Sequence, residues 1–354
     1  MWVRRAVTRR RYLNQAGTSW PKAPGVLDAV QQTLRVDPAR YAELFVEARE
    51  RIAGVLGIAS PEALLLTPGC TSAIAAVLLS RSWQPGDVVL TSAMEHQAML
   101  TPIEALVRHR GVEHYRVASR AGEPFDLDAL RDRLATGRVR AVAITAASNV
   151  TGERLPVEGI TAAARDAGAF SLVDAAQTAG LVHLDLPSLG ADAVAFAGHK
   201  GPLAPQGIGG LWIRDQKGFA APPGYCDLGS VNLPGAVAMA TSLEWLASTP
   251  THRRRPIDLR HRLREALRAR DDCTVFGGDG PSTSAVSFLH TRLEIDDAEE
   301  HFAAHGIVVR AGRHCAGQHL HGLDAPDGTI RVSFGVFNRD DDVDAVLEAL
   351  DAAR

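Results

Sequence analysis

The chain has 354 residues, a formal net charge of −3 and an isoelectric point near 6.5. Hydrophobic residues make up 46% and charged residues 22%, which is typical of a soluble globular protein. The length suggests one large and one smaller domain. This balance gives no reason to expect nucleic acid or an anionic membrane as a partner, and no apolar run is long enough to span a bilayer.

The cysteines at positions 70, 226, 273 and 315 show no CxxC pair and no zinc-ligand spacing. We therefore expect neither a metal site nor a disulfide framework, and a cytoplasmic location fits best. The arginine-rich start is followed by no apolar segment, so a signal peptide is not expected.

From about residue 60 to 215, short β-rich runs alternate with helical patterns. Strands are expected at 63–67, 87–92, 139–148, 169–176, 192–198 and 209–214, with helices at 70–80 and 96–110. This alternation predicts an α/β fold with a mostly parallel sheet, whose functional side chains gather at the carboxyl ends of the strands.

After residue 235 the pattern changes to that of a smaller α+β domain with an antiparallel sheet. Two long helical stretches precede the strand-like runs CTVF, AVSFLH, GIVVRAG and TIRVSF. We expect residues 1–25 to pack on this small domain and to complete its sheet, 26–235 to form the large domain, and 236–354 to form the small one.

Lys200 stands in the run AFAGHKGPLAPQG, between an apolar stretch and a glycine-rich one. These flanks predict a turn at the end of a buried strand, where a lysine has a lowered pKa and is available as a nucleophile or base.

Other polar residues follow the ends of other predicted strands. They are Asp174, with Gln177 one turn later, and Asn149 and His96. Taken alone, a buried aspartate at such a place is more often a cap, and a lone histidine is more often structural.

The turn Gly69-Cys70-Thr71 begins a predicted helix whose free N–H groups suit a phosphate, although it matches neither a P-loop nor a GxGxxG motif. A lysine, an acid, a stacking histidine, an amide and a phosphate cradle together are what pyridoxal 5'-phosphate (PLP) requires.

With these motifs the sequence resembles the class V aminotransferases of PLP fold type I, and among them the cysteine desulfurases with a short cysteine loop. The resemblance runs from residue 12 almost to the C-terminus. Its most specific stretches are TPGCTSA, SAMEHQAM, ASNVTGERLP, LVDAAQTAG, AGHKGPLAPQGIGGLWI, VRAGRHCAG and IRVSFGVFN.

The resemblance implies a role for each of these residues. Lys200 would attach PLP covalently, Asp174 would pair with its pyridinium nitrogen, Gln177 would bond its ring hydroxyl and His96 would stack on its ring. The phosphate would be held by Thr71, the backbone of Cys70, His199 and, from the partner subunit, Ser230. This last contact implies a homodimer with shared active sites.

Cys315 in VRAGRHCAG matches the cysteine that takes up sulfur as a persulfide, and neighbouring cationic groups would favour its thiolate. Its alternative reading is a small buried hydrophobe. Arg331 would clamp the substrate carboxylate with help from Asn149. The implied reaction converts L-cysteine to L-alanine and a Cys315 persulfide, for transfer to an unidentified acceptor protein.

Three features depart from the family pattern: Ala197 in place of a serine, the extra charge of Arg313, and a shortened region at 213–229. They leave open a related PLP-dependent C–S or C–Se lyase, acting on selenocysteine, cystine or a cysteine sulfoxide, that does not require Cys315. A non-catalytic scaffold and a transaminase are weaker alternatives.

Overall fold

A computed structural model describes residues 10–119, 124–182, 184–215 and 230–353. Its main feature is a seven-stranded sheet in the order β2-β8-β7-β6-β5-β3-β4, in which every neighbouring pair is parallel except those made by β8. The strands are β2 (Leu64–Thr67), β3 (Val88–Ser92), β4 (Glu113–Val117), β5 (Val139–Thr145), β6 (Phe170–Asp174), β7 (Ala193–Ala197) and β8 (Gly209–Ile213). The predicted α/β class is confirmed.

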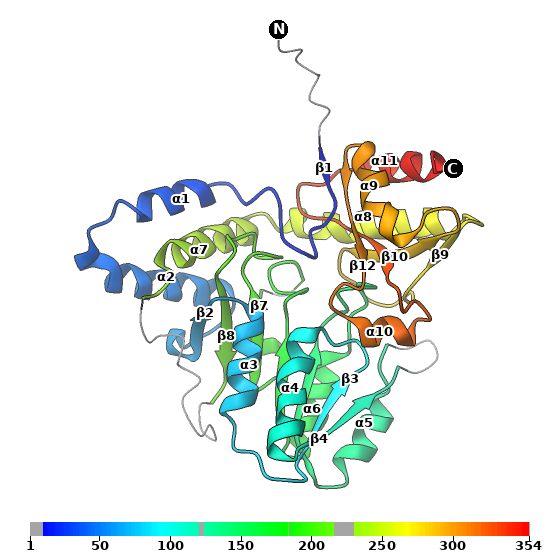
Figure 1. The fold of residues 1–354 in the computed structure, drawn as a ribbon. Coiled ribbons are helices and arrows are strands. Elements are labelled where there is room, and N and C mark those ends of the chain that lie inside the picture. Colours follow the sequence, from blue (N-terminus) through cyan, green and yellow to red (C-terminus); the bar gives the residue numbers. More distant parts are fainter. Residues whose placement is uncertain (1–9, 120–123, 183, 216–229, 354) are drawn as a thin grey trace.

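Helices cover both faces of this sheet, because its strands are apolar on both sides (Figure 1). One apolar cluster packs α3 and α4 against it, and another packs α2, α5, α6 and α7. The helices are α1 (Val26–Thr33), α2 (Tyr41–Val55), α3 (Cys70–Ser80), α4 (Gln97–Arg110), α5 (Leu127–Leu134), α6 (Val157–Asp166) and α7 (Leu233–Ser248), with short 3-10 turns at Pro38–Arg40, Pro61–Ala63 and Pro187–Leu189.

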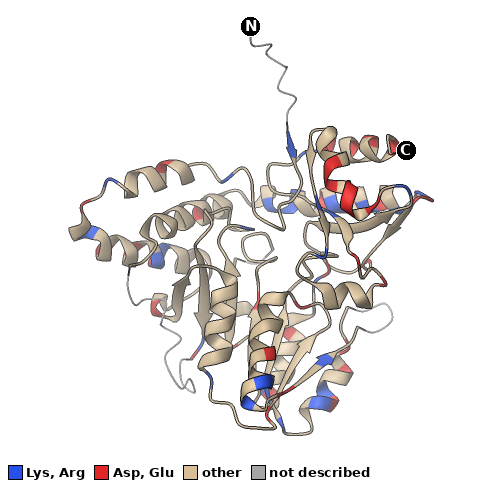
Figure 2. Cartoon of the chain, viewed as in Figure 1, with Lys and Arg blue, Asp and Glu red and all other residues tan. Residues whose placement is uncertain are grey.

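A third apolar cluster forms the core of the smaller body. Its antiparallel sheet has the order β12-β13-β10-β9. The elements are β9 (Cys273–Val275), β10 (Ala285–His290), β11 (Ile307–Val308), β12 (Arg310–Gly312), β13 (Thr329–Ser333), α8 (Pro250–Arg268), α9 (Ile295–Ala304), α10 (Gly317–Gly322) and α11 (Asp340–Asp351). Charged residues are frequent along α8, α9 and α11, whereas the large sheet carries few (Figure 2).

The described part of the N-terminal segment contacts the small body through a short strand. Its strand β1 (Arg11–Tyr12) pairs with β11 instead of joining the four-stranded sheet, which it touches through one bridge between Asn14 and Ser333. Helix α7 packs on α1 and α2 and contributes to the apolar cluster of the large body. Within the described ranges every helix is too short or too polar to cross a membrane.

Candidate active site

Lys200 lies in the turn after β7, and two glycines make this turn possible. A Cβ on Gly201 would stand 2.1 Å from the carbonyl oxygen of Ala179, and one on Gly180, whose φ is +78°, would stand 2.6 Å from the carbonyl carbon of Gly201. The two backbones therefore pack directly against each other and fix where the Lys200 side chain starts. Burial lowers the pKa of this amine, although the nearby Asp174 carboxylate opposes the shift.

One cavity brings most of the predicted site residues together at the carboxyl ends of the parallel strands. It is lined by Cys70, Thr71, His96, Ala98, Thr145, Asn149, Asp174, Ala176, Gln177 and Lys200. These residues come from the ends of β3, β5, β6 and β7 and from the start of α3. Five elements far apart in sequence thus converge on a single concave site, as parallel-sheet topology predicts.

Asp174 ends β6 and is 4% exposed. Its Oδ1 accepts hydrogen bonds from the Ala176 backbone N–H at 2.8 Å and from the Cys70 thiol at 3.2 Å. The Cys70 side chain therefore faces the acid, whereas the sequence had suggested the phosphate environment for this cysteine. Burial, and then the charge of Asp174, raises the pKa of Cys70, so this thiol stays protonated.

His96 is the N-cap of α4, and its Nδ1 accepts a hydrogen bond from the Ala98 backbone N–H at 3.0 Å. In the neutral ring this bond leaves the proton on Nε2. Burial, followed by the positive charge of Lys200, lowers the pKa of His96. The cap and the cavity together favour a neutral imidazole whose Nε2–H is free for another partner.

The start of α3 offers donors for an anion. Gly69 precedes the helix, no side chain caps it among the described residues, and a Cβ on Gly69 would meet nothing within 4 Å. His199, next to Lys200, has a buried Nδ1 that meets no hydrogen-bond partner among the residues that the structure describes, and burial lowers the pKa of this ring to about 4. Thr71 is exposed at the same helix end. This donor set fits the phosphate of PLP.

Gln177 and Ser230 differ in their surroundings. Gln177 lines the cavity, and its Nε2 donates to the Ala16 carbonyl at 3.2 Å. Ser230 is exposed, three residues before α7 begins at Leu233. Cys226 and most of the shortened 213–229 region lie outside the described residues.

Arg331 projects from β13 and is 4% exposed. Its Nη1 donates to the Asn149 carbonyl at 2.8 Å and its Nη2 to Asn14 Oδ1 at 3.0 Å, while its buried Nε has no hydrogen-bond partner in the described part of the chain. Burial lowers the pKa of this guanidinium to about 10, which still leaves it charged at neutral pH. A buried cation with a free donor is suited to a substrate carboxylate.

Cys315 is exposed in a loop that is docked onto the large body. Its carbonyl accepts from the Gln97 N–H at 2.9 Å, and the His314 carbonyl accepts from Asn149 Nδ2 at 2.8 Å. Residues 314 and 315 both have positive φ, 49° and 53°, which is uncommon outside glycine and typical of functional loops. Arg331 and Lys200 lie within electrostatic reach of Cys315.

His314, directly before Cys315, is not one of the cationic groups near this thiol. The His314 ring is buried against β13, where its Nε2 lies 2.9 Å from the Thr329 hydroxyl and 3.0 Å from its carbonyl oxygen. Burial lowers the pKa of His314 to about 3, so the ring is neutral at physiological pH. Cationic groups around Cys315 therefore come from across the cavity and from the exposed Arg313.

Two residues near the site were not among the predicted ones. Asn14 contacts Arg331 through its side-chain oxygen, and only its place in the motif stretch NQAGTS could have indicated it. Glu95, directly before His96, is 1% exposed, and its Oε1 accepts from the Ser92 hydroxyl at 2.5 Å and the Thr145 N–H at 3.0 Å. Burial raises the pKa of Glu95 to about 8.

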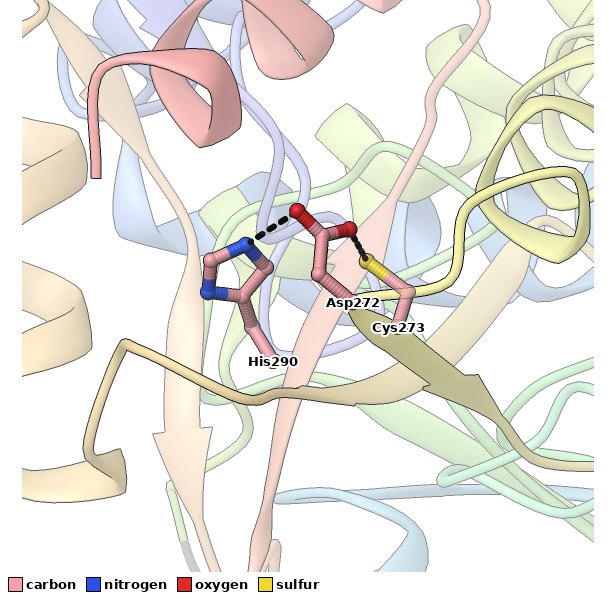
Figure 3. A group of neighbouring side chains, drawn as sticks. All are labelled: Asp272, Cys273 and His290. Carbon is pink, nitrogen blue, oxygen red and sulfur yellow. Dashed lines mark hydrogen bonds and ion pairs between the residues drawn. The ribbon is translucent and has the colours of Figure 1, made fainter. Parts of the chain in front are cut away.

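Asp272, Cys273 and His290 form a separate group at the β9–β10 edge of the small body (Figure 3). Arg270 donates to both Asp272 oxygens, at 2.8 and 2.9 Å, and the thiol of Cys273 points to one of them. Burial and this aspartate raise the pKa of Cys273 to about 11. The Arg270 guanidinium already occupies the carboxylate, and His290 Nε2 on β10 lies 3.3 Å from Asp272 Oδ2, so this group links the start of β9 to β10.

Comparison with known proteins decides the family. The model of the family described as Aminotransferase class-V matches residues 11–346. The chain belongs to this family. Its members use PLP, so the cofactor prediction is confirmed along with the fold.

Among its relatives, a probable cysteine desulfurase of Pseudomonas aeruginosa is 35% identical, with 96% of this chain and 92% of the relative covered. The crystal structure of the Escherichia coli cysteine desulfurase CsdA superimposes with a TM-score of 0.86 at 28% identity, covering 97% and 94% of the two chains. The apo structure of a cysteine desulfurase from Thermococcus onnurineus gives 0.89 at 26% identity, with the same coverage. The predicted resemblance to cysteine desulfurases is confirmed.

Proposed function

We propose that the protein is a PLP-dependent cysteine desulfurase that converts L-cysteine to L-alanine and keeps the sulfur on Cys315 as a persulfide. The observation that carries the proposal is the convergence of Lys200, Asp174, His96 and Asn149 on one cavity, with the Cys315 loop docked beside it. The relatives named as cysteine desulfurases, matched over nearly the whole chain, support the same function.

In this proposal the cavity residues bind PLP, which supplies an electron sink for charge that develops at the substrate α-carbon. Lys200 would attach it covalently and Asp174 would pair with its pyridine nitrogen. The amides at the start of α3, with Thr71 and His199, would bind its phosphate, while Gln177 and His96 would contact the ring. The orphaned Nδ1 of His199 and the open helix start are the features that the phosphate satisfies.

The substrate is oriented by its carboxylate. Arg331 can donate from Nε, which has no partner among the described residues, and from Nη2, which also donates to Asn14. These two N–H groups form a planar fork for a carboxylate. Asn149 stands between this arginine and the cysteine loop, because its carbonyl accepts from Arg331 and its amide donates to His314. Substrate binding and loop position are therefore coupled through Asn149.

Proton transfers fall to two side chains of the cavity. The Lys200 amine, with a pKa lowered by burial, would act as the base that takes the α-proton of the substrate. His96 presents Nε2–H and is suited to exchange a proton with the substrate sulfur.

Sulfur transfer is the task of Cys315. Its thiolate attacks the substrate sulfur, a sulfur–sulfur bond forms, and the β-carbon–sulfur bond breaks with its electron pair staying on carbon. Protonation of that carbon yields alanine. Arg331 and Lys200 lie close enough to Cys315 to interact with it electrostatically.

The test is alanine formation from L-cysteine, in the presence of a reductant, by the wild type, Cys315→Ala and Cys273→Ala. We expect the Cys315 variant alone to lose alanine formation, since Cys273 lies in the strand-edge group outside the cavity. Equal activity of the Cys315 variant, or pyruvate in place of alanine, would support the lyase that does not require Cys315.

The proposal includes a homodimer with shared active sites, in which Ser230 reaches the partner's phosphate site. Exposure of Ser230 and Thr71 in the single chain is compatible with such contacts. Sedimentation at several concentrations tests the dimer. A cytoplasmic location and an acceptor protein that takes sulfur from the exposed Cys315 complete the proposal.

A further inference from the structure

The two oxygens of Asp174 are not equivalent. Oδ1 accepts two hydrogen bonds, from the Ala176 N–H at 2.8 Å and from the Cys70 thiol at 3.2 Å. Among the described residues no hydrogen bond reaches Oδ2. Two donors on one oxygen fix the rotation of the carboxylate, so that its other oxygen is directed to a different partner.

Cys70 is well placed to keep this bond. It is the first residue of α3, it is 7% exposed, and it belongs to the apolar cluster that packs α3 and α4 on the sheet. Burial and the charge of Asp174 raise its pKa, so it remains an S–H donor through the physiological range. A thiol in this state is neither a nucleophile nor a site of sulfur transfer.

We propose that Cys70 is a positioning residue that acts on the cofactor through Asp174: its thiol holds Oδ1, presents Oδ2 to the pyridine nitrogen, and tempers the negative charge that this nitrogen meets. The inference rests on the proposed binding of PLP in the cavity. Cys70, at the start of a helix, thus has a function distinct from that of Cys315. The electron-accepting strength of the cofactor depends on the contact between Cys70 and Asp174.

The first test is spectroscopic. The visible absorption of the holoenzyme is titrated with pH in the wild type, Cys70→Ala and Cys70→Ser. Loss of the donor leaves the Asp174 charge less compensated, so protonated forms of the cofactor gain stability. We expect the midpoint to rise by about half a pH unit in Cys70→Ala, and Cys70→Ser to restore the wild-type midpoint. An unmoved midpoint in Cys70→Ala, or an equal shift in both variants, overturns the proposal.

A second test does not depend on PLP. In the apoenzyme, alkylation of each cysteine by iodoacetamide is followed by peptide mass spectrometry in the wild type and in Asp174→Asn. Removal of the charge lowers the pKa of Cys70, so we expect its alkylation to quicken several-fold while that of Cys273 stays unchanged. Unchanged Cys70 alkylation would show that the thiol does not interact with the acid. Failure to form alanine would contradict the desulfurase function and leave both of these measurements valid.

Discussion

At the scale of single residues, the state of His96 depends on its place at the start of α4. If Nδ1 were protonated, it could no longer accept the hydrogen bond from the Ala98 N–H, and two N–H groups would face each other. Protonation of His96 would therefore remove the N-terminal cap of α4. Burial and Lys200 act in the same direction. The ring should therefore stay neutral, with its proton on Nε2, at pH values below the ordinary histidine range.

We expect nitrogen NMR of ¹⁵N-histidine-labelled enzyme to show His96 as the Nε2–H tautomer at pH 7, with titration below pH 6.5. His109, which is exposed in the last turn of the same helix, is the internal comparison. A doubly protonated His96 ring at pH 6.5 would contradict the neutral-donor role given to it above.

The raised pKa of Glu95 predicts how the stability of the fold depends on pH. Its folded pKa of about 8 lies above the ordinary 4.5, so between these values the folded state binds more protons than the unfolded one. Stability should thus fall as pH rises through this window, by up to about 1.4 kcal/mol per pH unit. Glu95→Gln should flatten this slope in urea unfolding from pH 5 to 8, and Glu62→Gln, at an exposed position, should not. A slope unaltered in Glu95→Gln would show that this carboxyl is ionised when folded.

At the scale of elements, the turn after β7 controls where Lys200 lies. The Ala179 carbonyl that meets Gly201 is backbone, so it cannot rotate away from an added methyl group. In Gly201→Ala, the added methyl group should push this turn away from the segment that follows β6 and so displace the lysine. The substitution removes no side chain that is proposed to contact the cofactor.

We expect Gly201→Ala to weaken PLP binding to the apoenzyme about tenfold or more, because overpacking of this kind costs about 1–3 kcal/mol. Fluorescence titration with PLP measures it. Gly54→Ala in α2 is the matched control, since its Cβ would meet nothing within 4 Å. Equal affinity of the two variants would show that the turn can relax.

At the scale of the whole molecule, the sequence predicted those parts whose pattern is local. Buried parallel strands such as β5 and β7 read as apolar runs, and Lys200 and Asp174 could be placed at strand ends from their flanks alone. Edge strand β4 was missed, because its residues are half-buried and polar. The bond from the Asn149 amide to the His314 carbonyl could not be predicted, since it depends on how the small body docks on the large one.

One buried side chain, Arg260 of α8, joins these two bodies. It is fully buried, and it donates to the Ala285 carbonyl of β10 at 2.9 Å and to the Thr151 carbonyl at 3.2 Å. Thr151 follows Asn149 by two residues, so this arginine holds the loop that carries the contacts to Arg331. Its loss would leave buried carbonyls without donors and would free that loop.

We expect Arg260→Leu to lower the free energy of unfolding by about 2–4 kcal/mol and to raise KM for L-cysteine more than it lowers kcat. Urea unfolding and steady-state kinetics measure the two effects. Arg268→Leu, on the same helix but partly exposed and paired with Asp279, should cost less than about 1 kcal/mol and leave KM unchanged. If Arg260→Leu lost stability with no change in KM, the arginine would support the core of the small body without positioning the substrate loop.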